Sequence, residues 1–69
     1  MNQLRISMEA ARVNARLTQK QLGHQIGVSE FTIRRWETGK GLPRVDQFHA
    51  FCEAVGVSAD NIILPKNLG

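Results

Sequence analysis

Residues 18–39 read TQKQLGHQIGVSEFTIRRWETG, and this stretch decides the fold. Thr18 and Gln21 have the spacing of a capping box, which predicts the start of one helix. Gly27 predicts the end of that helix, because glycine enters the left-handed conformation without a steric penalty. Ser29 is a favoured N-cap for a second helix. The stretch therefore predicts two short helices joined by a tight turn.

The second predicted helix has two unlike faces. Ile33 and Trp36 lie three residues apart, on the side expected to be buried. The other side carries an aromatic ring, two guanidinium groups and a hydroxyl, from Phe31, Arg34, Arg35 and Thr38. An exposed aromatic residue and two arginines do not stabilise a core. They suit a groove lined with base edges and phosphates.

The stretch resembles the phage cro/cI repressor-type (XRE-family) helix-turn-helix regulators. The resemblance rests on the opening Thr18-Gln19, the small Gly23, Gly27 at the turn, Ile33, and the final Trp36-Glu37-x-Gly39-Lys40. It extends to Ala11–Ala15 before the motif and to Pro43–Ile63 after it, and so covers roughly residues 7–64. It implies sequence-specific binding of double-stranded DNA, with residues 29–38 or so in the major groove.

The resemblance also suggests which residues contact DNA. Base contacts are expected from Ser29, Glu30, Phe31, Thr32, Arg34 and Arg35, with about half of the six reaching bases directly. Two alternatives stay open: one arginine of the pair contacts phosphate instead, and Thr32 bonds only within the first turn. Phosphate contacts are expected from Gln19, Thr38, Lys40 and Arg44.

Two structural features and three departures accompany this resemblance. It implies an ion pair between Arg12 and Glu37, and Gly23 is expected where the two motif helices pack closely. The family usually has Gly, a Ser or Thr cap, and Gln at three positions where this chain has Arg16, Arg44 and Glu30 respectively. Arg16 should therefore carry mild strain in a left-handed turn, or the turn must differ.

Composition limits the class of protein. The 69 residues make one small domain of net charge +3, and residues 16–44 hold six basic residues against two acidic ones. The single Cys52 is expected in the core, and His24 and His49 are far apart in sequence, so no metal or cofactor is expected. The chain shows no catalytic constellation, apolar membrane span or signal peptide. We therefore expect a cytoplasmic protein that is not an enzyme and binds no small-molecule ligand.

The expected fold is all-α, a compact five-helix bundle in which helices 2 and 3 form the helix-turn-helix. Residues 1–6 are assigned to an N-terminal arm, residues 7–64 to the domain and residues 65–69 to a C-terminal tail. Ser7 should cap the first helix, with an extended segment before it. The alternative is that the first helix begins earlier, near Leu4. A fourth helix is expected over Val45–Val55, and Ser58 should cap a short fifth helix.

The predicted function is transcriptional regulation, most simply repression in a phage or mobile element by a dimer on a pseudo-palindrome. The apolar run Ile62-Ile63-Leu64 is a candidate dimer surface, or alternatively completes the core. A different class of function, an antitoxin or a protein-interaction adaptor with the same fold, is the alternative. The sequence does not distinguish these, nor repressor from activator.

Overall fold

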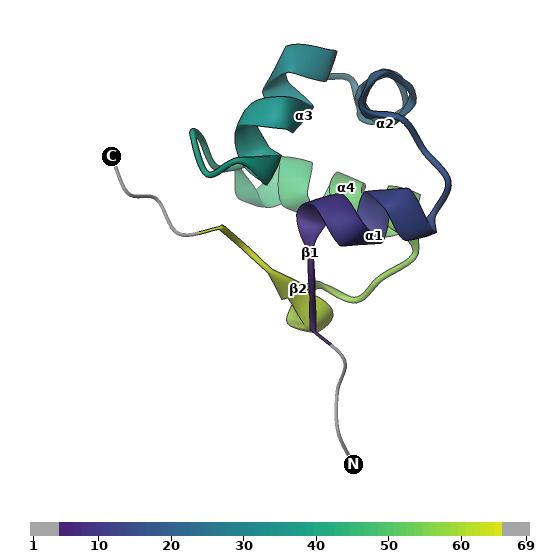
Figure 1. The fold of residues 1–69 in the computed structure, drawn as a ribbon, viewed down its shortest axis with the longest axis vertical. Helices are drawn as coiled ribbons and strands as arrows, with labels where there is room; N and C mark the ends of the chain where they lie inside the picture. Colours follow the sequence, from purple (N-terminus) through teal and green to yellow (C-terminus); the bar gives the residue numbers. More distant parts are fainter. Residues whose placement is uncertain (1–4, 66–69) are drawn as a thin grey trace.

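The computed structural model describes residues 5–65. Four α-helices, α1 (Met8–Asn14), α2 (Gln19–Ile26), α3 (Glu30–Glu37) and α4 (Val45–Val55), account for most of it. Two short strands, β1 (Ile6–Ser7) and β2 (Ile62–Ile63), and a 3₁₀ turn, η1 (Ala59–Asn61), complete the chain. Figure 1 shows α2 and α3 at one end of the molecule and the strands at the other.

Local signals set the helix starts as predicted. The hydroxyls of Ser7, Thr18 and Ser29 each accept a hydrogen bond from the backbone N–H three residues later, which satisfies a donor that the helix itself leaves unpaired. Thr18 and Gln21 complete the reciprocal capping box, with 2.9 Å for both bonds. These caps confirm the predicted starts of α1, α2 and α3.

The predicted five-helix count is wrong. Ser58 caps only the single 3₁₀ turn η1, and the chain then becomes extended as β2. Ile62 pairs with Ile6 and Ser7 with Ile63 in a parallel register. Because β-branched isoleucines favour extended backbone, pairing with β1 is preferred over another helical turn. Ile6, assigned above to the arm, therefore lies in the strand pair.

All four helices contribute to one core. Its buried apolar residues are Met8, Ala11, Leu22, Ile33, Trp36, Phe51, Cys52 and Val55. Phe48 is half-buried and stacks on Phe51 with a centroid distance of 6.4 Å. Burial raises the pKa of the Cys52 thiol, so this group is a protonated, apolar core residue, as expected. Ile62 packs against the same core from β2.

The turn between α2 and α3 depends on two glycines. Gly27 ends α2 at φ 81°, a conformation that only glycine adopts readily. Gly23 is buried, and a Cβ atom placed on it would lie 2.6 Å from the Val28 carbonyl oxygen. The Gly23 carbonyl also accepts from the N–H groups of Gly27 and Val28. The turn therefore folds directly against the α2 backbone at Gly23.

We expect Gly23→Ala to destabilise the domain by about 1–3 kcal/mol, since the added methyl group would meet a backbone oxygen that cannot move aside without displacing the start of α3. Urea unfolding followed by circular dichroism measures this. Gln25→Ala, at an exposed position of the same helix, is the matched control and should change stability by less than about 0.5 kcal/mol. Equal stability of the two variants would contradict the tight packing at Gly23.

The turn between α1 and α2 contains a strained residue. Arg16 has φ 63°, the left-handed conformation expected for this position, and its side chain is exposed. This backbone conformation costs an L-residue about 1–2 kcal/mol. Glycine avoids that cost, but it loses more conformational freedom on folding, which would offset roughly half of the gain. Arg16→Gly should therefore raise the free energy of unfolding by about 0.5–1 kcal/mol.

Arg16→Ala separates strain from charge, because alanine removes the guanidinium group but keeps the Cβ atom. We expect no comparable gain in unfolding free energy for Arg16→Ala in the same urea titration. A gain in both variants would mean that charge repulsion, not backbone strain, is relieved.

Candidate nucleic-acid interface

A polar network joins three helices beneath the motif. Arg12 of α1 donates from Nε to Glu37 Oε2 at 2.6 Å and from Nη2 to Glu37 Oε1 at 3.2 Å. Its Nη1 donates to the Leu17 carbonyl at 2.8 Å. Gln19, the first residue of α2, donates from Nε2 to Glu37 Oε1 at 3.0 Å. The Glu37 carboxylate thus accepts three hydrogen bonds.

This network is nearly closed to solvent, since the side chains of Arg12 and Glu37 are 11% and 3% exposed. A carboxylate so buried needs hydrogen-bonding partners, and both of its oxygens have them. Because Glu37 is the last residue of α3, the network ties that helix to α1 and to the start of α2. The side-chain amide of Gln19, which is also predicted to contact phosphate, donates one of its N–H groups to Glu37.

The outer face of α3 is exposed to solvent. Glu30, Phe31, Arg34 and Arg35 are exposed there, whereas Ile33 and Trp36 are buried on the inner face. Phe31 leaves 59% of its surface accessible. The Phe31 ring therefore lies at the surface, on the same exposed face as Arg34 and Arg35.

The first turn of α3 is bonded locally. The Ser29 hydroxyl accepts from the Thr32 backbone N–H at 3.0 Å and lies 2.9 Å from the Thr32 hydroxyl. Thr32 is half-buried. Among the alternatives left open above, the structure thus has Thr32 bonded within the first turn. The hydroxyls still have lone pairs, so a further acceptor role remains chemically available.

Arg35 does not project freely from α3. Its Nη2 donates to the Lys40 carbonyl at 2.6 Å, and the Lys40 N–H donates back to the Arg35 carbonyl at 2.9 Å. Its Cζ atom also lies 5.8 Å from the centroid of the Phe31 ring. Arg35 therefore links the middle of α3 to the loop that follows.

The loop from Thr38 to Arg44 carries three of the four predicted phosphate contacts. Thr38 donates its hydroxyl to the Arg34 carbonyl at 2.9 Å, and Lys40 is exposed. Arg44 precedes α4 without a side-chain cap, because a guanidinium group has no acceptor. Instead Gln47 Oε1 accepts from the Arg44 backbone N–H at 2.8 Å.

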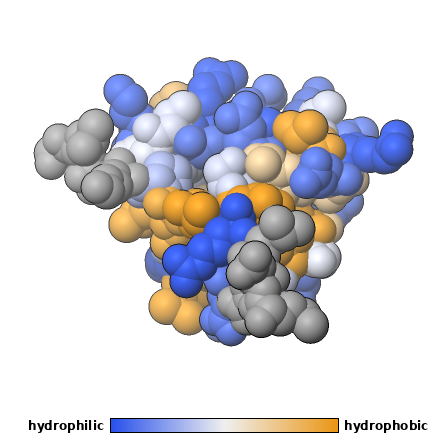
Figure 2. All heavy atoms as spheres, turned by 60° about the horizontal axis from the view of Figure 1, so that its bottom comes forward, coloured by the Kyte–Doolittle hydropathy of each residue, from blue (hydrophilic) through white to orange (hydrophobic). Residues whose placement is uncertain are grey.

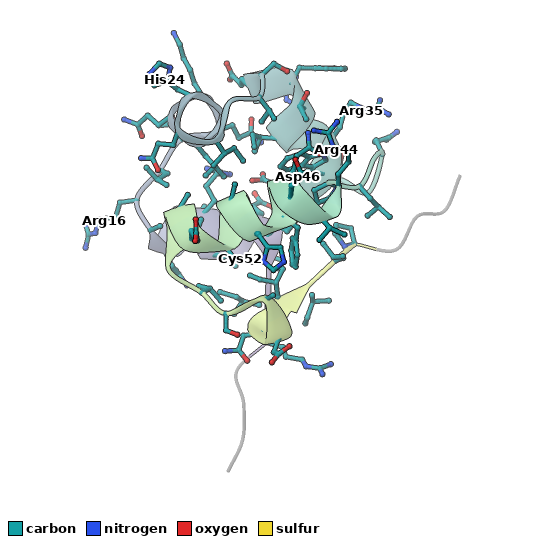
Figure 3. All side chains as sticks on the ribbon, turned by 180° about the vertical axis from the view of Figure 1, so that it is seen from behind. Arg16, His24, Arg35, Arg44, Asp46 and Cys52 are labelled. Atoms are coloured by element: carbon teal, nitrogen blue, oxygen red, sulfur yellow. The ribbon has the colours of Figure 1, made fainter. Side chains whose placement is uncertain are left out.

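Arg44 also pairs with Asp46 at 3.3 Å, both side chains being largely exposed. Hydrogen bonding from Arg44 lowers the pKa of the Asp46 carboxyl, and the charge of the guanidinium group acts in the same direction. Asp46 thereby offsets a positive charge at a helix N-terminus, which is otherwise unfavourable. Figure 3 shows Arg35 and Arg44 on one side of the molecule and Arg16 on the other.

Two contacts of the site were not predicted, although the sequence contains signals for them. Phe31 and Arg35 have the i, i+4 spacing that brings helical side chains together. Gln47 stands at the third helical position after Arg44, where a glutamine reaches back to the N-cap N–H. The contacts of Arg35 with Lys40 and of Gln19 with Glu37 have no such sequence signal.

A family model described as a helix-turn-helix domain matches residues 3–62. The chain belongs to this helix-turn-helix family. The family consists of XRE-type regulators, so the resemblance found in the sequence is confirmed. Within residues 5–65 of this helix-turn-helix domain, no helix has the length and apolar character to cross a bilayer. The same residues contain no group of three His, Cys, Asp or Glu side chains suited to a metal ion.

One relative is the HTH-type transcriptional activator BcrR of Enterococcus faecalis. It is 31% identical over 61 residues, which is 88% of this chain. The chain spans about 30% of the length of that relative. The similarity therefore concerns the helix-turn-helix domain.

We expect Glu37→Gln or Arg12→Met to destabilise the domain by about 3–5 kcal/mol, because each leaves a buried partner unpaired. So small a core cannot absorb this loss, and circular dichroism should report a largely unfolded chain at 25 °C. The double variant Arg12→Met/Glu37→Leu removes both charges and should recover most of the stability. If it is no more stable than the single variants, the ion pair itself is the main source of stability.

Proposed function

We propose that this helix-turn-helix domain is a sequence-specific, double-stranded-DNA-binding transcriptional regulator whose α3 enters the major groove. The observation that carries the proposal is the contrast between the two faces of α3. Ile33 and Trp36 hold the inner face in the core, and the outer face presents Phe31 and Arg34 to solvent. An α-helix fits the width of the major groove, where each base pair has a distinct pattern of donors and acceptors.

Three exposed residues of α3 have side chains suited to base edges. The Arg34 guanidinium matches guanine O6 and N7, and the Phe31 ring matches a thymine methyl group. Glu30 would accept from cytosine N4 and disfavour a nearby phosphate. Ser29 and Thr32, already bonded to each other, would add contacts through their remaining lone pairs.

Phosphate contacts would hold α3 in register. Thr38, Lys40 and Arg44 follow the helix, and the start of α2 presents backbone N–H groups at Gln19. One N–H of its amide donates to Glu37, so Gln19 would contact phosphate through its second side-chain N–H or through its backbone N–H. These contacts supply affinity that depends on salt but not on sequence.

We further propose that two copies bind a pseudo-palindrome, because one such module contacts too little DNA for high specificity. Ile63 and Leu64 are 48% and 40% exposed, which supports their role as a contact between copies, whereas Ile62 packs on the core. Figure 2 brings the side of β1 and β2 forward and shows an apolar band across that face.

The proposed mode of regulation is repression by occupancy of a promoter, since occupancy requires only DNA binding. BcrR carries the name of an activator, and its chain is much longer than this domain. A reporter gene with the selected site placed across its promoter tests the sign. Lower expression on production of the protein supports repression, and higher expression makes this domain part of an activator.

Binding-site selection from random duplex DNA tests the function itself. We expect a pseudo-palindromic consensus bound roughly 10³-fold or more over random DNA, with affinity that falls steeply with salt. Lys40→Ala should weaken all sequences alike and lower the salt slope by about 1, as expected for loss of one phosphate contact. Arg34→Ala should instead relax one base position.

Arg5→Ala is the matched control, because it removes the same charge just before β1, at the opposite end of the molecule from α3 (Figure 1). It should leave the salt slope unchanged. If wild type selects no consensus and binds DNA weakly, the regulator proposal is wrong. A protein partner, as for an antitoxin or an adaptor, is then the function to pursue.

A further inference from the structure

The two neighbouring arginines of α3 differ in their surroundings. Within residues 5–65, the side chain of Arg35 hydrogen-bonds to the protein and that of Arg34 does not. Arg35 and Lys40 exchange two bonds, one from Nη2 to the Lys40 carbonyl and one from the Lys40 N–H to the Arg35 carbonyl. Arg34 and Arg35 have equal charge and adjacent positions, but they are not equivalent.

The guanidinium group of Arg35 is held on two further sides. The Phe31 ring lies within cation–π range, at 5.8 Å from Cζ to the ring centroid. The Gly41 backbone lies close by, so that a Cβ atom added to Gly41 would be 3.5 Å from Nε and 3.6 Å from Nη2. Nε and Nη2 form one of the paired donor edges with which arginine recognises guanine. That edge faces the protein.

We propose that Arg35 is a positioning residue for recognition, not a reader of its own base pair. It fixes the Phe31 ring on the outer face of α3 and ties the phosphate-contacting loop at Lys40 to the same helix. This inference rests on the proposed function, because it concerns the role of Arg35 in DNA recognition. It places direct readout on Glu30, Phe31 and Arg34 and removes Arg35 from the expected set.

Contacts within the unbound protein can order groups before they meet DNA. An exposed phenylalanine and a flexible loop each lose conformational freedom when they are immobilised against DNA, and this loss weakens binding. Contacts that already restrict both in the unbound protein reduce the loss. A direct guanine contact by Arg35 would instead require breaking the 2.6 Å bond to Lys40 or using the opposite edge of the guanidinium group alone.

The first experiment needs no DNA. Amide hydrogen exchange at Lys40, read by NMR, should be roughly five- to tenfold faster in Arg35→Ala than in wild type. Arg34→Ala is the matched control, since it removes the same charge from the adjacent position, and its Lys40 exchange should equal that of wild type. Phe31→Leu should also shift the Arg35 Nε–H resonance, because the aromatic ring current is lost. Equal Lys40 exchange in the two arginine variants would overturn the proposal.

The second experiment maps specificity on the selected site. Arg35→Ala and Phe31→Ala should relax the same base pair, by roughly 5- to 150-fold in discrimination, and the double variant should lose little more than either single variant. Arg34→Ala should relax a different base pair and combine additively with Phe31→Ala. If Arg35→Ala relaxes a base pair of its own, additively with Phe31→Ala, Arg35 is a direct reader and the proposal is wrong.

The two experiments separate this proposal from the function on which it rests. If no DNA sequence is selected by wild type, the regulator function fails. The exchange and chemical-shift measurements still decide whether Arg35 holds Phe31 and the loop.

Discussion

The buried carboxylate of Glu37 is the constraint on which the rest of the structure depends. It ends α3 and accepts hydrogen bonds from Arg12 of α1 and Gln19 of α2. An unpaired charge at this depth would be costly, so the three helices must meet with these groups aligned. Burial of Ile33 and Trp36 fixes which side of α3 faces inward, and Glu37 fixes where its end lies. The outer face of α3 is thereby oriented by contacts made on the inner side.

Most of the helical framework could be predicted because its signals are local. Each helix cap, at Ser7, Thr18 or Ser29, involves only residues within four positions of it, and so does the turn at Gly27. The end of the chain could not be predicted in this way. Ser58 does cap a turn, but Ile62 and Ile63 become a strand because β1, more than fifty residues earlier, offers a partner.

The contacts of the candidate site also differ in whether local sequence predicts them. The Arg12–Glu37 pair spans 25 residues and was expected only from family resemblance, since no spacing rule connects two positions so far apart. The contact between Phe31 and Arg35 follows helical periodicity and was available to sequence reasoning. The bond from Arg35 to Lys40 depends on the path of the chain after Gly39, which turns at φ 77°. Sequence indicated the glycine but not which carbonyl the turn would present.

Both ends of α3 are bonded before any partner is present. Ser29 and Thr32 close the first turn, and Arg35 and Lys40 close the end of the helix against its loop. A domain this small has little core to hold a surface rigid, so short-range polar bonds must do so. Each such bond engages a donor or acceptor within the protein and restricts the groups beside it. Arg35, which is bonded to Lys40, and Arg34, which has no side-chain bond to the protein within residues 5–65, therefore differ although both lie on the exposed face of α3.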